Sequence, residues 1–260
     1  MTEFGFIGGG RMATAIRDGL LQQVGENSIK VFDPHLSDES SWKSFSVDSL
    51  GELLTNCRVV FLAVKPQVFK EKKVEWSKLS TKAEVVVSVM AGISLDEIAS
   101  VFSQSELIRT MPNTPMMLSS GMLALCKSEN SGDKTLHLVA KLFSPIAKTL
   151  IVDEKQMDAV TAVSGSGPAY FFYLTEHLVN HSKELGLEPK AVQFLWAQTM
   201  KGAAEMLLQD GADPGILREQ VTSPGGTTQA ALESFSHSNL GEIFFSGVKQ
   251  ARDRSVELGK

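Results

Sequence analysis

Cysteine is scarce in this chain, and that scarcity excludes two classes of protein. Only Cys57 and Cys126 occur in 260 residues, in different expected elements, with no CxxC spacing and no flanking histidine. A disulfide-stapled scaffold is therefore excluded, and two core thiols are expected rather than a redox pair. This usage is typical of a reduced, cytoplasmic protein.

Several other signals are also missing. No apolar run reaches membrane-spanning length, and the N-terminus enters a folded pattern within three residues, so neither a transmembrane helix nor a signal peptide is expected. The net charge is −5 with both signs scattered, so no nucleic-acid partner and no acidic tail are expected. His177 and His181 share a helix face, but no HExxH pattern or third ligand accompanies them. We interpret them as solvated or interface histidines and expect no metal site.

What is present divides the chain into two halves. The first half alternates short apolar runs with helical patterns. Strands are expected at 4–7, 29–32, 59–64 and 84–89, with further strands near 107–110, 122–126 and 149–152; helices are expected at 11–23, 48–55, 67–79 and 94–102. Such alternation predicts an α/β fold, a doubly wound parallel sheet of Rossmann type, over residues 1–152.

After Asp153 the strand signals stop. Helical spacing of apolar residues predicts helices at 154–163, 166–186, 189–210, 214–220, 227–236 and 239–258, separated by glycine and proline. Residues 153–260 are thus expected to form an all-helical domain. Because so few helices cannot hide every apolar face alone, we expect this domain to associate with another copy.

A glycine motif follows the first strand and opens the first helix. Gly8, Gly10 and Ala13 fit G-x-G-x-x-A in the context that a dinucleotide-binding turn requires, with Arg11 and Met12 between them. The first glycine permits the tight turn, the second lets the backbone approach a pyrophosphate, and Ala13 keeps helix and strand close. The alternative to a dinucleotide site is a turn in which the glycines only avoid steric clashes and bind no ligand.

Polar residues follow other expected strands. Asp33 is placed to accept hydrogen bonds from the adenosine ribose, which favours NAD, although it also fits a turn before Pro34. His35 and Lys43 are placed to meet a 2′-phosphate instead, so the coenzyme stays open. Lys65 either contacts the cofactor or is solvated. Asn113 and Thr114, in a loop stiffened by prolines, either serve the site or cap a turn.

The segment Val221–Leu232 combines a glycine turn, a proline and hydroxyls with the start of a helix. Small oxygens and free backbone N–H groups there favour an anionic ligand. The segment contains no acid, base or thiol. Any chemistry at this place must therefore be driven by a group bound elsewhere. The alternative to an anion-binding site is a glycine-rich helix cap that binds no ligand.

Together these motifs resemble the pyrroline-5-carboxylate reductases, which catalyse the last step of proline biosynthesis. The resemblance rests on residues 5–13, 62–67, 109–115, 158–170 and 221–232, in family order through both halves. It implies a dimer that interlocks through the helical domain, often with five dimers in a ring. This chain departs from the family members that favour NADPH, because Asp33 and Leu50 stand where small hydroxyl or amide residues are usual.

The resemblance also implies site residues. The dinucleotide is expected at Gly8, Gly10, Arg11, Met12, Ala13, Asp33, Ala63, Val64, Lys65, Ala91 and Asn113, and the substrate at Ser223, Gly225, Gly226, Thr227 and Thr228. The helical break Gly165–Ala169 either serves this site or permits close packing against a partner subunit.

The resulting hypothesis is hydride transfer from NADPH or NADH to the C=N bond of 1-pyrroline-5-carboxylate, giving L-proline. Backbone N–H groups around 225–228 would hold the carboxylate, and the Thr228 hydroxyl would orient the ring nitrogen. A cyclic imine can arrive already protonated, which fits a motif without an acid. The alternatives are another two-domain oxidoreductase of small acids, or a non-catalytic NAD(P)-binding sensor.

Overall fold

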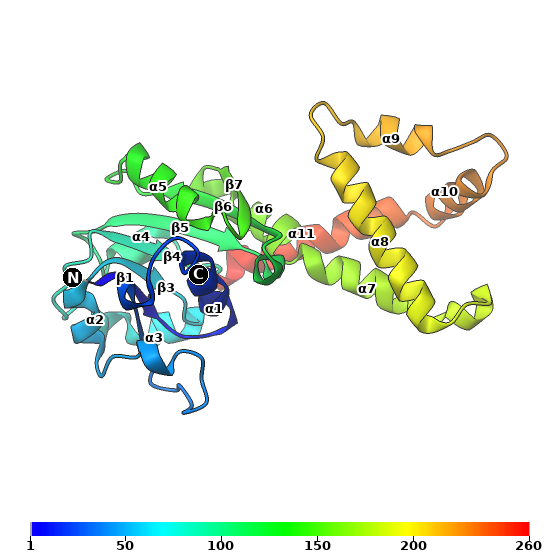
Figure 1. The fold of residues 1–260 in the computed structure, drawn as a ribbon. Helices are drawn as coiled ribbons and strands as arrows, with labels where there is room; N and C mark the ends of the chain where they lie inside the picture. Colours follow the sequence, from blue (N-terminus) through cyan, green and yellow to red (C-terminus); the bar gives the residue numbers. More distant parts are fainter. Residues whose placement is uncertain (1, 260) are drawn as a thin grey trace. The chain divides into compact units, whose positions relative to one another are not determined.

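The computed structural model describes residues 2–259. The chain divides into two compact units. Unit 1 comprises the residues up to Ser166 together with the chain end from Ala251, and unit 2 comprises Gly167–Gln250. Figure 1 labels most of the helices and strands of both units along the chain.

Unit 1 is built on a seven-stranded sheet. Its strands are β1 (Thr2–Ile7), β2 (Ile29–Phe32), β3 (Cys57–Leu62), β4 (Val85–Ser88), β5 (Glu106–Pro112), β6 (Gly121–Lys127) and β7 (Ala147–Ile151), in the order β2-β1-β3-β4-β5-β6-β7. The strands from β1 to β5 run parallel. Each of the seven strand segments predicted from the sequence is confirmed.

The last two strands reverse direction. β6 pairs antiparallel with β5, and β7 runs parallel to β6. The chain crosses from β5 to β6 through a short 3₁₀ turn, Thr114–Leu118, that begins next to Asn113. A parallel connection needs about a dozen residues or more, so a link of this length can only return antiparallel.

Helices cover both faces of this sheet, as the fold class predicted. They are α1 (Arg11–Leu20), α2 (Leu50–Asn56), α3 (Pro66–Trp76), α4 (Leu95–Ala99), α5 (Asp133–Phe143) and α6 (Met157–Val160). Because side chains alternate along a strand, Phe61 and Val87 pack in one core with α1 and α5. Val60 and Val86 pack in the other, with α2, α3 and α4. The doubly wound arrangement is therefore confirmed.

Helix α5 was not predicted from the sequence. Its buried residues are Leu136, Val139 and Phe143, a spacing that places all three on one helical face. The helical spacing of apolar residues was thus present in the sequence between the sixth and seventh strands, where no helix or strand was predicted.

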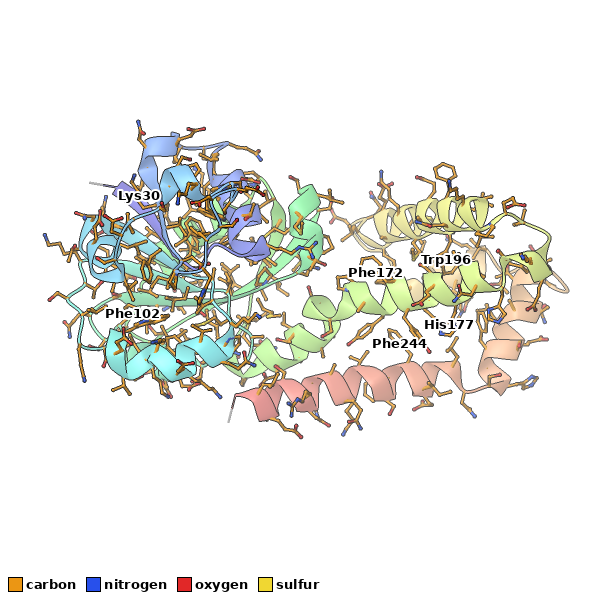
Figure 2. All side chains as sticks on the ribbon, turned by 90° about the horizontal axis from the view of Figure 1, so that it is seen from below. Lys30, Phe102, Phe172, His177, Trp196 and Phe244 are labelled. Atoms are coloured by element: carbon orange, nitrogen blue, oxygen red, sulfur yellow. The ribbon has the colours of Figure 1, made fainter. Side chains whose placement is uncertain are left out.

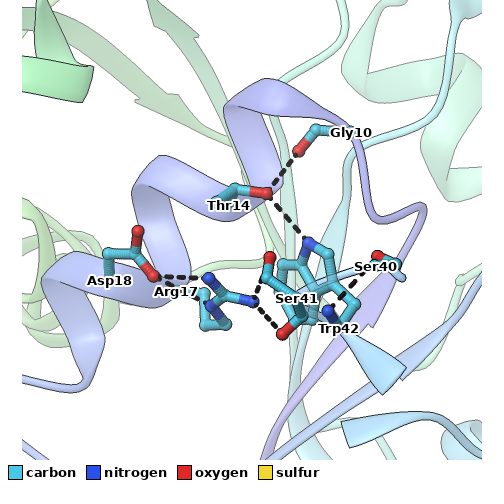
Figure 3. Close-up of polar contacts among 7 residues, drawn as sticks. All are labelled: Gly10, Thr14, Arg17, Asp18, Ser40, Ser41 and Trp42. Atoms are coloured by element: carbon cyan, nitrogen blue, oxygen red, sulfur yellow. Dashed lines mark hydrogen bonds and ion pairs between the residues drawn. The ribbon is translucent and has the colours of Figure 1, made fainter. Parts of the chain in front are cut away.

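The segment after β2 is fastened to α1. Arg17 is buried with its guanidinium carbon 4.5 Å from the centroid of the Trp42 ring. It donates to the carbonyl of Ser41 at 2.7 Å and pairs with Asp18 at 2.8 Å. The indole N–H of Trp42 donates to the Thr14 hydroxyl at 2.9 Å, and that hydroxyl donates to the Gly10 carbonyl at 3.2 Å (Figure 3).

We expect Thr14→Val to lower the free energy of unfolding by about 1–2 kcal/mol, because it strands the N–H of a buried tryptophan without an acceptor. Valine keeps the shape of the side chain. Thr55→Val on α2 is the matched control: the Thr55 hydroxyl donates only to carbonyls one turn back in its own helix, at 2.9 and 3.2 Å. Urea unfolding of both variants checks this, and equal losses would contradict it.

Unit 2 is entirely helical. It holds α7 (Gly167–Asn180), α8 (Pro189–Leu207), α9 (Pro214–Gln220), α10 (Thr227–His237) and most of α11 (Leu240–Leu258). Within residues 167–250, all of them described, Val192 is the one large apolar side chain that is buried. These helices therefore lack an apolar core of their own, as their number led us to expect.

Candidate active site

The ends of five parallel strands meet at one edge of the sheet in unit 1. Ile7 pairs with Phe32 on one side and with Leu62 on the other, and Leu62 is in register with Ser88, which pairs with Arg109. The residues that follow these strands therefore lie side by side. Chain order also changes direction between β1 and β3, and such a switch point is where open α/β sheets bind their ligands.

The glycine turn after β1 leaves open space where a dinucleotide would need it. Gly8 has φ +97°, and a Cβ added there would meet the Ala63 carbonyl oxygen at 2.8 Å. A Cβ added at Gly10 would meet nothing within 4 Å. Helix α1 begins directly after Gly10, with no side-chain cap and no acidic residue in its first turn. The turn therefore fits a pyrophosphate, which needs close backbone approach and uncapped N–H groups.

The other residues of the motif have distinct surroundings. Ala13 is fully buried against the sheet. Met12 is half-buried and packs against the same core. Arg11 is exposed, and its guanidinium lies 4.0 Å from the sulfur of Met117.

Asp33 lies beside the glycine turn. Its Oδ2 accepts from the Gly9 N–H at 2.8 Å, and its Oδ1 accepts from the His35 N–H at 2.9 Å. The carboxylate thus joins the end of β2 to the turn after β1. It is a half-buried acidic group held at the place where an adenosine ribose binds in Rossmann-type sheets.

The chain after β3 also reaches this edge. Ala63 donates to the Ile7 carbonyl at 2.9 Å, which keeps it against the glycine turn. Ala63 and Val64 are half-buried, and Lys65 is exposed at the start of α3. No hydrogen bond fixes the Lys65 amine among residues 2–259, so its side chain is available to a ligand.

Two further loops complete the edge. After β4, Ala91 is half-buried and precedes Gly92, which has φ +73°. After β5, the side-chain oxygen Oδ1 of Asn113 accepts from the Met122 N–H at 2.9 Å. This bond holds the Asn113 side chain between the two antiparallel strands, whereas Thr114 is exposed and begins the 3₁₀ turn.

Ser164 was not singled out by sequence reasoning, although it lies close to this edge. The Asn113 amide nitrogen is 3.5 Å from the Ser164 hydroxyl oxygen. Ser164 belongs to a π-helix, Thr161–Gly165, whose wide turn is closed by a bond from the Ser166 N–H to the Thr161 carbonyl at 2.8 Å. Such π-turns occur often at functional sites, but spacing in a sequence does not reveal them.

In unit 2, the segment Ser223–Thr228 forms a turn and a helix start. Gly225 has φ +70°, and the Gly226 N–H donates to the Ser223 carbonyl at 3.0 Å. Gly226 precedes the first residue of α10, which has neither a side-chain cap nor an acidic residue in its first turn. Thr227 is exposed and Thr228 is half-buried. The helix start therefore offers uncapped N–H groups and hydroxyls to an anion.

Gln229 is a second residue that sequence reasoning missed. Its Oε1 accepts from the Gly225 N–H at 2.7 Å, and its Nε2 donates to Glu233 at 2.7 Å. The Gly225 N–H is therefore already engaged. The N–H groups that this segment can offer to an anion are those of the first turn of α10. Gln229 acts here as a positioning residue for the left-handed Gly225.

Other groups considered in the sequence carry no site. Both cysteines are buried, and burial raises the pKa of Cys57 to about 11 and that of Cys126 to about 12, which keeps them as thiols near neutral pH. His177 and His181 are exposed on α7 and just after it. No cluster of three or more metal-ligand side chains is found between residues 2 and 259. In the same range, no helix has the length and hydrophobicity needed to span a bilayer.

A glycine turn at the switch point of a doubly wound sheet defines the class: this is a Rossmann-type dinucleotide-binding protein with a helical second unit. Known proteins narrow the class further. Residues 3–92 match the family model described as NADP oxidoreductase coenzyme F420-dependent, and residues 154–258 match the model described as pyrroline-5-carboxylate reductase dimerisation.

Full-length relatives agree with these matches. Pyrroline-5-carboxylate reductase from Arabidopsis thaliana is 35% identical over 99% of this chain and 96% of its own length. The structure of a pyrroline-5-carboxylate reductase from Coxiella burnetii is 31% identical, with a TM-score of 0.88 and coverage of 100% and 99%. A Plasmodium falciparum pyrroline carboxylate reductase with NADP bound is 26% identical, with a TM-score of 0.86 and coverage of 100% and 98%. The chain belongs to the pyrroline-5-carboxylate reductase family.

The surface of unit 2 fits the self-association that a dimerisation domain provides. Large apolar side chains are exposed along its helices, among them Phe172, Phe194, Leu208 and Ile243. Figure 2 shows Phe172 on α7 and Phe244 on α11. An accumulation of exposed large apolar side chains of this kind marks a protein interface.

We expect Phe172→Glu to weaken self-association at least about tenfold, since truncating or charging a central aromatic at an interface costs about 2 kcal/mol or more. Val74→Glu on α3 is the matched control, because Val74 is 65% exposed and Phe172 is 66% exposed, but Val74 lies in unit 1. Sedimentation over a range of protein concentrations measures both association constants. If both variants associate like the unmodified chain, this role of Phe172 is wrong.

Proposed function

We propose that this protein is a pyrroline-5-carboxylate reductase, which transfers hydride from NADPH or NADH to the C=N bond of 1-pyrroline-5-carboxylate to give L-proline. The observation that carries the proposal is the uncapped start of α10 at Ser223–Thr228, an anion site without acid or base, in a chain of this family. When bound, the reduced dinucleotide supplies the hydride. The residues of this chain bind and orient the two reactants and shield them from water.

In this proposal unit 1 holds the dinucleotide. Gly8 shapes the turn, Gly10 leaves room for the pyrophosphate, and the start of α1 at Arg11, Met12 and Ala13 provides N–H donors. Asp33 meets the adenosine ribose. The residues assigned to the path toward the nicotinamide are Ala63, Val64, Lys65, Ala91 and Asn113.

The segment in unit 2 holds the substrate. Ser223, Gly225, Gly226 and Thr227 surround the carboxylate, which is stabilised by the N–H groups and dipole at the start of α10. The Thr228 hydroxyl oxygen accepts from the protonated ring nitrogen and orients the imine. No general acid is required, because the imine can bind in its protonated form. Catalysis is then mainly the positioning of two bound reactants.

The proposal assigns residues 1–152 to dinucleotide binding and residues 153–260 to substrate binding and self-association. We further propose that dimers are the building block, that five dimers can form a ring, and that the protein works in the cytoplasm. The match of residues 154–258 to a dimerisation family supports the first of these, and two free, buried cysteines fit a reducing compartment.

One assay separates this reaction from its rivals. Oxidation of NADH and of NADPH is followed by absorbance with 1-pyrroline-5-carboxylate, and in parallel with small hydroxy and keto acids. The proposal expects turnover with the cyclic imine alone. A sensor would oxidise neither coenzyme with any substrate, and an oxidoreductase of small acids would prefer the acids; either result would reject the proposed reaction.

A further inference from the structure

The coenzyme preference follows from what surrounds Asp33. Each oxygen of this carboxylate accepts one backbone N–H, from Gly9 at 2.8 Å and from His35 at 2.9 Å. An ionised carboxylate offers about four acceptor positions, so two remain for hydroxyl donors of a bound ribose. The carboxylate therefore binds to the protein without using up its capacity as an acceptor.

The chain segment that begins at Asp33 is negatively charged in sum. The segment from Asp33 to Asp48 carries Asp38 and Glu39 as well, and Lys43 is its single lysine or arginine. The Lys43 amine is paired with the Asp38 carboxylate at 2.8 Å. From the sequence, Lys43 is a candidate partner for a 2′-phosphate; in the structure its amine lies in an exposed ion pair with Asp38.

A buried cation packed against this segment is also engaged. Arg17 is 6% exposed, stacks on Trp42 and is bonded to Ser41 and Asp18 (Figure 3). The same contacts hold the segment on α1, and the Val47 N–H donates to the Val31 carbonyl at 2.9 Å where the segment returns to the sheet. The segment is thus fastened to α1 at its middle and to the sheet near its end.

The two coenzymes differ only at the 2′ position of this ribose. NADH presents a 2′-hydroxyl, which can donate to the carboxylate in a charge-assisted hydrogen bond. NADPH presents a phosphate that carries a charge of about −1.5 to −2, offers acceptors and repels a carboxylate. We propose that this chain binds NADH in preference to NADPH, and that Asp33 sets the preference. The inference rests on the proposed dinucleotide site at the glycine turn.

Isothermal titration calorimetry with NADH and with NADPH tests this on the full-length protein, without substrate. The unmodified protein is expected to bind NADH at least about tenfold more tightly, a difference of about 1.4 kcal/mol. Asp33→Asn keeps the size of the side chain and an acceptor for one N–H but removes the charge. It is expected to raise the affinity for NADPH and lower that for NADH, so that the ratio falls about tenfold or more. Asp33→Ser, which is smaller, should move the ratio in the same direction.

Glu39→Gln is the matched control. It removes one negative charge from the same segment, six positions further on, at an exposed residue. Its ratio of affinities is expected to stay unchanged, and thermal unfolding without nucleotide verifies that all variants fold. Equal or tighter binding of NADPH by the unmodified protein overturns the preference. If Asp33→Asn changes both affinities equally, Asp33 does not set the coenzyme preference and only stabilises the glycine turn. Absence of binding for both coenzymes rejects the dinucleotide site itself, and with it the proposed function.

Discussion

Gly10→Ala is expected to lower the affinity for both NADH and NADPH about a hundredfold, or about 2.7 kcal/mol, while the fold stays intact. The reason is the open space beside Gly10, where an added methyl group meets no protein atom within 4 Å. The methyl group would instead occupy the position that a pyrophosphate needs. Calorimetric titration with each coenzyme measures the loss, and urea unfolding measures stability.

Gly25→Ala supplies the matched control. Gly25 also precedes a helical turn, has the same φ of −74° as Gly10, and likewise has nothing within 4 Å of an added Cβ. Both variants should therefore change the free energy of unfolding by a similar amount, within about 1 kcal/mol. Only Gly10→Ala should lose coenzyme affinity. Equal affinities in the two variants would show that the pyrophosphate binds elsewhere.

Thr228→Ala is expected to lower kcat about a hundredfold with 1-pyrroline-5-carboxylate, with little change in coenzyme affinity. Thr228 is half-buried in the first turn of α10, and its hydroxyl makes no hydrogen bond to any residue between 2 and 259. Losing that hydroxyl removes the group proposed to orient the imine, and misplaced reactants lose rate steeply. Steady-state kinetics at saturating coenzyme measure the effect.

Two variants separate orientation from a loss of structure. Thr228→Ser keeps the hydroxyl and should retain most of the activity. Thr222→Ala removes a half-buried threonine close by whose hydroxyl donates to the Arg218 carbonyl at 2.6 Å, and should leave kcat within about threefold, a change of about 0.7 kcal/mol. An unchanged kcat in Thr228→Ala, or an equal loss in Thr222→Ala, would remove Thr228 from the proposed mechanism.

Local patterns were sufficient to predict most of the fold. Most strands of unit 1 are short apolar runs. Val85–Ser88, for example, is buried along its whole length, and such a run can be recognised without tertiary information. The direction of β6 was not predictable in this way. It depends on the length and shape of the turn after Asn113, whereas the composition of the strand is the same for either direction.

The residues of the site likewise differ in how far the sequence alone could predict them. The glycine turn and the helix start at Thr227 were readable because each is set by neighbours in the sequence. The approach of Asn113 to Ser164 was not, since the pair is separated by 51 positions and depends on a π-turn. The bonds of Asp33 are intermediate: the sequence placed the carboxylate at the end of a strand, but only the structure shows Gly9 and His35 as its donors.

The shortage of buried apolar residues in unit 2 has a thermodynamic consequence. A unit that buries Val192 and no other large apolar side chain among residues 167–250 gains too little from its own packing to offset the chain entropy of ordering its helices. The missing burial must come from a second copy, so the native form of these helices is linked to subunit concentration by mass action. The start of α10 belongs to the same unit. The Ser223–Thr228 segment is therefore fully structured only in the assembled protein, and so is any catalysis that needs this segment. We expect dilution, which favours dissociation of the subunits, to unfold the segment.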